Sequence, residues 1–321
     1  DGKGWAPFSF TEASVAVPST LYRLFDIFAY WTGSAVALEA VNWNQSTGSI
    51  TAATTASPVV VTSTAHGLAN GDLVGIAGMA GLTDLDSRIW PVANKAANTF
   101  EAEGSFGVGA YTSGGTWYKM PNTRATALTT QNGVYVKSGD ATRRYLGTGM
   151  TTGSTGETQC YFGQAGAFGS LLGGSWLLWN YYHRSPVALF AGDTANSWTY
   201  TGTAWRVTDI NSDNKVEFVL GLAEGDVYAE ASCHSSNDTG AHQGLGIGLD
   251  RATVNSSKLN PFEYAQPGGT AVPTARYFGT PAAGYHAIWP LEITTGVGIS
   301  TWYGDFNLTW TQGGIMVNLE A

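Results

Sequence analysis

Charged side chains are scarce in this sequence. Asp, Glu, Lys and Arg make up 12% of the 321 residues, about half of their usual share. The formal net charge is −9, and the one compact basic cluster is Arg143 with Arg144. Phosphate binding needs clustered Lys and Arg, so nucleic acid is excluded as a partner. Neutral polar surface is easier to desolvate than charge, which favours assembly.

Cysteine is scarce as well. Cys160 and Cys233 are the two cysteines, and neither has a second cysteine at metal-ligand spacing. Two buried free thiols are the favoured interpretation, and a disulfide between them stays open. The sequence has no signal peptide and no apolar run near ~18 residues, so we expect no secretory segment and no membrane insertion.

The motifs of common enzyme classes are missing too. We find no nucleophile elbow, P-loop, zinc-protease helix or EF-hand loop. His234 and His242 lie near each other, but two histidines do not make a metal site. A solvated strand face or a turn cap explains most of the carboxylates considered: Glu217, Glu224, Asp226, Glu230, Asp250, Glu292 and Asp305. We therefore expect no enzyme activity, no catalytic residues, no metal and no cofactor.

The clearest local structure lies in Asn132–Gly149. This segment opens on Asn132-Gly133, and a second turn, Ser138 to Asp140, separates two stretches rich in Val, Tyr and Thr. Asn-Gly supplies positive φ at low cost, and β-branched and aromatic residues suit a pleated surface. The pattern predicts a β-hairpin at the centre of a β-rich protein.

Before this hairpin, the sequence predicts a strand over 5–17 and a buried strand in the apolar run 21–31. Asp26 within that run is either a turn or bulge residue or a buried carboxylate paired with a donor. Short strands at close spacing between 52 and 118 predict a separate small β-module. We therefore predict a main β-domain over 1–45 and 121–321, interrupted by an inserted β-sandwich or barrel module over 46–120.

After the hairpin, 148–174 reads as an extended loop, and 175–184 as a strand or one helical turn leading into a strand. Residues 216–222 and 227–233 alternate around a turn, which predicts a meander hairpin. Gly244, Gly246 and Gly248 alternate with apolar residues and leave one strand face bare, so another backbone can approach closely. The overall prediction is an all-β fold with a sandwich-like or jelly-roll-like main domain.

Aromatic side chains are the remaining candidates for a site. Such rings can form a sugar-stacking platform, or they can belong to the core or to a subunit interface. We favour core or interface, since buried aromatic anchors are the commoner use. The candidate glycan or interface aromatics are Trp176, Trp179, Tyr181, Tyr182, Trp289, Trp302 and Tyr303.

The sequence also resembles a known class of proteins. Asn132–Thr148 resembles a segment that recurs in tailed-bacteriophage virion proteins of the tail-fibre and head-decoration type. Four further segments resemble those proteins in the same order: Trp179–Arg184, Ser197–Arg206, Gly246–Asp250 and Thr301–Asp305. Separately, Ala65–Leu82 with Asn98–Phe100 is similar to a small β-module of phage tail proteins. His183 and the glycine-rich stretch between Gly156 and Trp176 depart from the usual pattern.

The resemblance implies a non-enzymatic structural or adhesive protein located in the virion. It implies a homotrimer that contacts other proteins of the head or tail and touches the host surface. The alternative is a lectin-like receptor-binding module that stacks host surface glycans on exposed aromatic rings, for example in loops 161–183 or 260–290. A polysaccharide depolymerase is disfavoured, because neither a β-helix repeat nor a carboxylate pair is recognisable.

Overall fold

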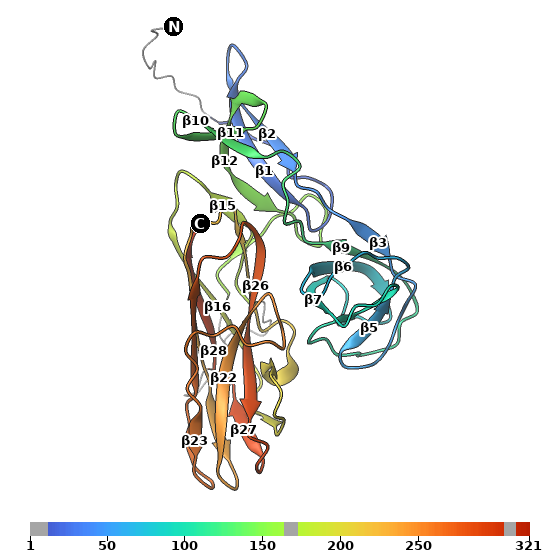
Figure 1. Cartoon of the computed structure of the whole chain (residues 1–321), viewed down its shortest axis with the longest axis vertical. Coiled ribbons are helices and arrows are strands. Elements are labelled where there is room, and N and C mark those ends of the chain that lie inside the picture. Colours follow the sequence, from blue (N-terminus) through green and yellow to red (C-terminus); the bar gives the residue numbers. More distant parts are fainter. Residues whose placement is uncertain (1–11, 164–172, 305–312) are drawn as a thin grey trace.

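The computed structural model describes residues 12–163, 173–304 and 313–321 (Figure 1). Nearly all of its regular structure is β-strand, and the helical structure in these ranges is one 3-10 turn, η1 (Thr208–Ile210). The predicted all-β fold is therefore confirmed. Across the described ranges, no helix is long and apolar enough to cross a membrane.

The first sheet contains the hairpin predicted at 132–149. Asn132 and Gly133 both have positive φ, of 52° and 77°, as a two-residue hairpin turn requires. The turn joins β10 to β11, and the next turn joins β11 to the long strand β12. The sheet order is β10-β11-β12-β1-β2, with β15 also paired to β12. The strands are β1 (Leu24–Trp31), β2 (Val36–Asn42), β10 (Leu128–Gln131), β11 (Val134–Lys137), β12 (Asp140–Met150) and β15 (Leu178–Asn180).

Asp26 on β1 is a buried carboxylate with donors, which decides between the two alternatives left by the sequence. Arg124 Nε donates to its Oδ2 at 2.8 Å, and Thr148 Oγ1 donates to its Oδ1 at 2.7 Å. The Arg124 guanidinium also lies over the Trp43 ring, 4.4 Å from its centroid. Burial raises the pKa of Asp26, while Arg124 and Thr148 act in the opposite direction.

The second sheet lies between Thr47 and Lys119 and has a hydrophobic core of its own, which includes Trp90, Phe100 and Trp117. Its order is β3-β9-β6-β7-β8-β5-β4. The sequence neighbours β3 and β4 thus lie at opposite ends of the order, so the sheet curls toward closure (Figure 1). The boundaries 46–120 stay a prediction. The strands are β3 (Thr47–Ser49), β4 (Ala52–Ala53), β5 (Val59–Thr62), β6 (Leu73–Ala80), β7 (Arg88–Ala93), β8 (Thr99–Ala102) and β9 (Ser113–Lys119).

The remaining strands build a sandwich. One sheet has the order β13-β14-β19-β26-β22-β23, with β18 paired to β26. Its inner side chains share a core with those of a second sheet, β16-β28-β20-β25. The first sheet of the sandwich contains β13 (Cys160–Tyr161), β14 (Ser175–Trp176), β18 (Arg206–Val207), β19 (Val216–Leu220), β22 (Ala241–Leu249), β23 (Glu263–Ala265) and β26 (Gly284–Thr294).

The second side of the sandwich is a long sheet with a break. Its near part is β16-β28-β20-β25 and its far part is β17-β27-β21-β24, so the chain neighbours occupy the same places in both orders. Cys233 separates β20 from β21 and is buried at the break. The strands are β16 (Pro186–Gly192), β17 (Trp198–Tyr200), β20 (Val227–Ser232), β21 (His234–Asn237), β24 (Thr270–Ala271), β25 (Thr274–Gly279), β27 (Ser300–Tyr303) and β28 (Gly314–Glu320).

The predicted meander hairpin of 216–222 and 227–233 is wrong. β19 pairs with β14 and β26, whereas β20 pairs with β25 and β28 on the other side of the sandwich. The connection therefore crosses from one sheet to the other. Alternation along a strand determines which side chains face inward, but it does not determine the partner strand.

Several smaller predictions also need correction. Cys160 and Cys233 are free, but Cys160 is exposed and only Cys233 is buried. The strand predicted over 5–17 lies partly outside the described residues, and 12–17 have no strand structure. The predicted loop 148–174 begins later than expected, because β12 continues to Met150. Residues 175–184 contain two short strands, as one of the alternatives predicted.

The bare face of β22 is covered by the chain itself. Ser257 Oγ accepts a hydrogen bond from Ile247 N at 2.8 Å, and Ser256 N donates to Ile247 O at 2.7 Å. A Cβ at Gly246 would lie 2.9 Å from the Trp205 ring and 2.9 Å from Asn255 Oδ1. The close approach predicted from the glycines is therefore made by another segment of the same chain.

Candidate functional site

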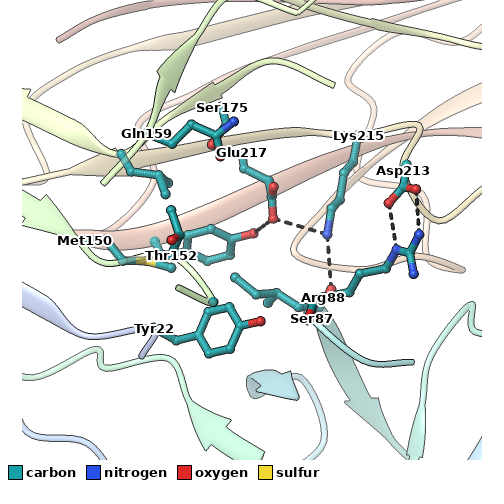
Figure 2. Close-up of a pocket in the computed structure, with 14 residues that line it drawn as sticks. Tyr22, Ser87, Arg88, Met150, Thr152, Gln159, Ser175, Asp213, Lys215 and Glu217 are labelled. Carbon is teal, nitrogen blue, oxygen red and sulfur yellow. Dashed lines mark hydrogen bonds and ion pairs between the residues drawn. The ribbon is translucent and has the colours of Figure 1, made fainter. Parts of the chain in front are cut away.

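A cavity of about 150 Å³ lies where the three parts of the chain meet (Figure 2). Its wall combines Tyr22 before β1, Arg88 and Ile89 on β7, and Lys215 and Glu217 beside or on β19. The first sheet, the small module and the sandwich therefore each contribute side chains to the cavity wall. The further lining residues are Ser87, Met150, Thr152, Gly153, Gln159, Ser175, Leu177, Asp213 and Tyr285.

A buried lysine is bound on one side of this cavity. Lys215 Nζ lies 3.1 Å from Glu217 Oε1 and donates to the Ile89 carbonyl at 3.3 Å, with its side chain 7% exposed. Tyr285 Oη also donates to Glu217 Oε1. Burial raises the pKa of Tyr285, and the Glu217 charge adds to the effect. The Lys215 ammonium, the Glu217 carboxylate and the Tyr285 hydroxyl thus pair with one another. The bond from Lys215 to the Ile89 carbonyl connects the start of β19 to β7.

A two-bond ion pair crosses the same cavity. Arg88 donates through Nε and Nη2 to the two Asp213 oxygens, each at 2.7 Å (Figure 2). Burial disfavours the ionised Asp213 carboxyl, but the two Arg88 bonds outweigh it and hold its pKa below the ordinary value. Such fork-shaped pairs fix geometry as well as charge.

A second ionic clamp holds the small module against the sandwich. Glu103 is 3% exposed, and its Oε2 accepts a hydrogen bond from Arg251 Nε at 2.6 Å. Its other oxygen accepts bonds from Thr253 N and Oγ1, both at 2.7 Å. Gly104 beside it leaves no room for a side chain, since a Cβ there would lie 2.6 Å from the Ala252 Cβ. The module is therefore fixed at two separate points.

The charged groups of the cavity bind one another and connect the parts of the chain that meet there, so we call this cavity the joint. Its lining residues, all of them described, include the hydroxyls of Ser87 and Ser175 but no histidine or cysteine that could activate them. Both carboxylates, Asp213 and Glu217, are already paired with cations. In the described part of the chain, no three His, Cys, Asp or Glu side chains are arranged to hold a metal ion.

Replacing Glu103 with Gln tests the clamp. The variant keeps the side-chain volume and one acceptor for Thr253, but it removes the charge that Arg251 faces. We expect the free energy of unfolding to fall by about 1.5–3 kcal/mol, the range for hydrogen bonds to charged groups. Urea unfolding measures it. Glu101→Gln is the control, because Glu101 contacts Asn94 within the module; an equal loss in both variants would contradict a specific clamp.

The aromatic residues singled out in the sequence occupy different environments. Trp179, Trp289 and Trp302 are at most 1% exposed, so their rings offer no face to a glycan. Tyr182 is 43% exposed, with its hydroxyl 2.8 Å from Arg144 Nε. Half-buried side chains are those of Trp176, Tyr181 and Tyr303. The structure brings Trp179, Tyr181 and Tyr182 together.

Two carboxylates that the sequence suggested were solvated are not. Glu292 is fully buried between Arg206 and Trp198, and Glu217 faces the joint. The joint was not predicted because Arg88 and Asp213, and likewise Lys215 and Ile89, are more than 120 residues apart in the chain. One signal was available: Lys215 and Glu217 flank Val216 in a strand that is otherwise apolar.

Comparisons with known proteins give no family. No family model and no curated protein matches the chain. Among solved structures, the chain is similar to the insecticidal delta-endotoxin Cry8Ea1 of Bacillus thuringiensis, with 8% identity over 94% of this chain and 53% of that chain and a TM-score of 0.23. The chain thus spans about half the length of that protein.

Two structures from infectious bursal disease virus are also similar. The Gx strain structure has 12% identity, covers 95% of this chain and 77% of that chain, and has a TM-score of 0.19. The VP2 subviral particle has 10% identity, covers 95% and 76%, and has a TM-score of 0.16. At these TM-scores we infer neither the fold nor the function of this chain from the three structures.

Proposed function

We propose that the chain is a non-enzymatic structural protein of a bacteriophage virion, an appendage or capsid-decoration protein that assembles as a homotrimer and contacts other virion proteins. The sequence resemblance along most of the chain supports the virion location and the trimer. The geometric observation that carries the proposal is the outer face of the sheet β16-β28-β20-β25, which has the properties of an assembly surface.

Two cross-strand rows make up this face. One row contains Phe190, Met316, Glu230 and Arg276, and the next contains Ala188, Asn318, Tyr228 and Phe278. Phe278 is 63% exposed and Phe190 is 38% exposed. The two charges in these rows, Glu230 and Arg276, are paired with each other at 3.1 Å. Aromatic side chains with few free charges are typical of the centre of an interface.

Hollows on both sides of the rows add shape to the face. One of about 560 Å³ lies beside Phe278 and Pro186, and one of about 270 Å³ lies beside Phe190 and Gly313. The exposed rings of one copy can insert into the hollows of another copy, and such a fit makes the surfaces of symmetric subunits complementary.

The mass in solution tests this proposal. We expect light scattering to give about three times 33.8 kDa for the full chain, and Phe278→Glu to shift the mass toward the monomer because a buried unpaired charge opposes contact. Val108→Glu, at a 57% exposed position in the small module, is the control. A monomeric wild type, or a Phe278→Glu variant of unchanged mass, would overturn this arrangement.

A further inference from the structure

The outer face of β22 is a strip of backbone without side chains. Leu245 and Ile247 point into the core and are at most 1% exposed, whereas the alternate positions Gly244, Gly246 and Gly248 face outward. The strip begins at His242, which is exposed and pairs across the strands with Tyr264 of β23.

Three aromatic rings lie along this strip in order. Tyr264 has its ring centroid 5.1 Å from that of His242. Phe262 covers Gly244, where a Cβ would come within 2.9 Å of the ring, and Trp205 covers Gly246 at the same distance. The Phe262 and Trp205 centroids are 6.1 Å apart at 66°. The glycines therefore seat the rings directly on the backbone and set them in a row.

The row is held rigidly but is not buried. Tyr264 is 53% exposed and Phe262 is 43% exposed, while Trp205 is half-buried against the core. Asn255 and Ser257, on the segment that leads to Phe262, accept hydrogen bonds from Ile247 N at 3.2 and 2.8 Å. Exposed rings on a fixed backbone lose little conformational freedom when a ligand binds.

The charges near the row favour a neutral ligand. Arg206 follows Trp205 but is paired with Glu292 at 2.7 Å, and Arg251 at the end of the strip is paired with Glu103 at 2.6 Å. Both guanidinium groups already donate hydrogen bonds to buried glutamates, which reduces their availability to an anionic ligand. The polar groups in the row itself are the His242 imidazole and the Tyr264 hydroxyl, which can hydrogen-bond to neutral hydroxyls.

We propose that Trp205, Phe262 and Tyr264 form a platform that binds a neutral saccharide chain. The C–H faces of successive pyranose rings would lie on the aromatic rings, and sugar hydroxyls would reach His242 and the Tyr264 hydroxyl. This proposal deepens the proposed function by giving the appendage a ligand class. Phe262 and Tyr264 lie within 260–290, one of the loops named for the lectin-like alternative, although none of the three rings is among the seven candidate aromatics. The platform lies on a different sheet from the assembly face.

An array of neutral and acidic glycans, probed with the full-length protein, tests the platform. We expect binding to neutral glycans, and at least a tenfold weaker apparent affinity for the double variant Phe262→Ala/Tyr264→Ala. Trp31→Ala is the matched control, because it removes a ring of similar exposure, 51%, from the first sheet and leaves the assembly face intact. The proposal would be overturned if the protein bound no neutral glycan on the array or bound acidic glycans alone. It would also be overturned if the double variant bound as strongly as the wild type.

The mass of the same samples separates this proposal from the proposed function. We expect the double variant to keep the wild-type mass in light scattering. A change in mass would make the row an interface between copies and would overturn the saccharide platform. A monomeric wild type that binds neutral glycans through these rings would overturn the trimer and leave the platform standing.

Discussion

Replacing Arg124 with Ala is expected to lower the free energy of unfolding by about 3–5 kcal/mol, as removal of one partner from a buried ion pair does. The Asp26 side chain is 2% exposed and that of Arg124 is 14% exposed. The variant leaves the Asp26 charge buried with Thr148 as its remaining donor. It also removes the cation over Trp43 and the hydrogen bond from Nη2 to the Gly221 carbonyl, which links the first sheet to the sandwich.

Urea unfolding at neutral pH measures this effect. Lys137→Ala in the same sheet is the control, because Glu39 keeps its pair with Arg143 at 2.8 Å. The control should lose less than about 1 kcal/mol, as is usual for partly exposed pairs. If Arg124→Ala were no worse than Lys137→Ala, the buried network would not hold the first sheet in place.

Replacing Glu292 with Gln is expected to remove a pH dependence of stability. Glu292 is fully buried, and burial raises its pKa to about 7 although Arg206 and Trp198 donate to it. The folded protein therefore holds a proton that the unfolded chain, with an ordinary glutamate pKa, releases. This group's stabilising contribution is complete below about pH 4.5 and is lost as the pH rises to about 7.

Unfolding free energies of both proteins between pH 4 and pH 8 check this sign. The wild type should lose roughly 3 kcal/mol relative to Glu292→Gln across that window, at about 1.4 kcal/mol per pH unit. Asp209, whose pKa is raised to about 6 by burial and by Asp193, acts in the same direction in both proteins. A constant difference between the two proteins would mean that Glu292 stays ionised throughout.

Local structure could be predicted because its causes are local. Asn132 and Gly133 determine a turn that few other pairs adopt, and the hairpin follows from them. The apolar run around Asp26 likewise required either a turn or a paired carboxylate. The hairpin depends on residues within a few positions of each other, whereas the choice between the two alternatives for Asp26 depends on Arg124 and Thr148, which are 98 and 122 residues away.

Strand partners and buried charges could not be predicted in the same way. The alternation in 216–222 and 227–233 correctly places their apolar side chains inward, yet the two strands belong to opposite sheets. Glu292 stands in an ordinary alternating position, and its burial depends on Arg206, which is distant in the chain. A pattern of period two carries no information about what covers a given face.

The joint and the separate Glu103 clamp could not be predicted from the sequence for the same reason. Arg88 and Asp213 are 125 residues apart, and Glu103 and Arg251 are 148 apart. Each of these side chains looks like ordinary solvated charge in its own segment. The row on β22 could be predicted in part, because the alternating glycines are apparent in the sequence. The rings that cover these glycines come from two other segments, and the sequence does not indicate them.

Because of the way the small module joins the main chain, we expect that it can be exchanged as a unit. Lys119 N donates to Ser46 O at 2.9 Å, so the chain leaves for the module and returns from it at neighbouring points. A short turn there could close the main chain without the module, and a different domain could be grafted in its place. Arg88 and Glu103 set the condition for such a graft, because a foreign domain without them would hang from two strands and leave Asp213 and Arg251 without their partners.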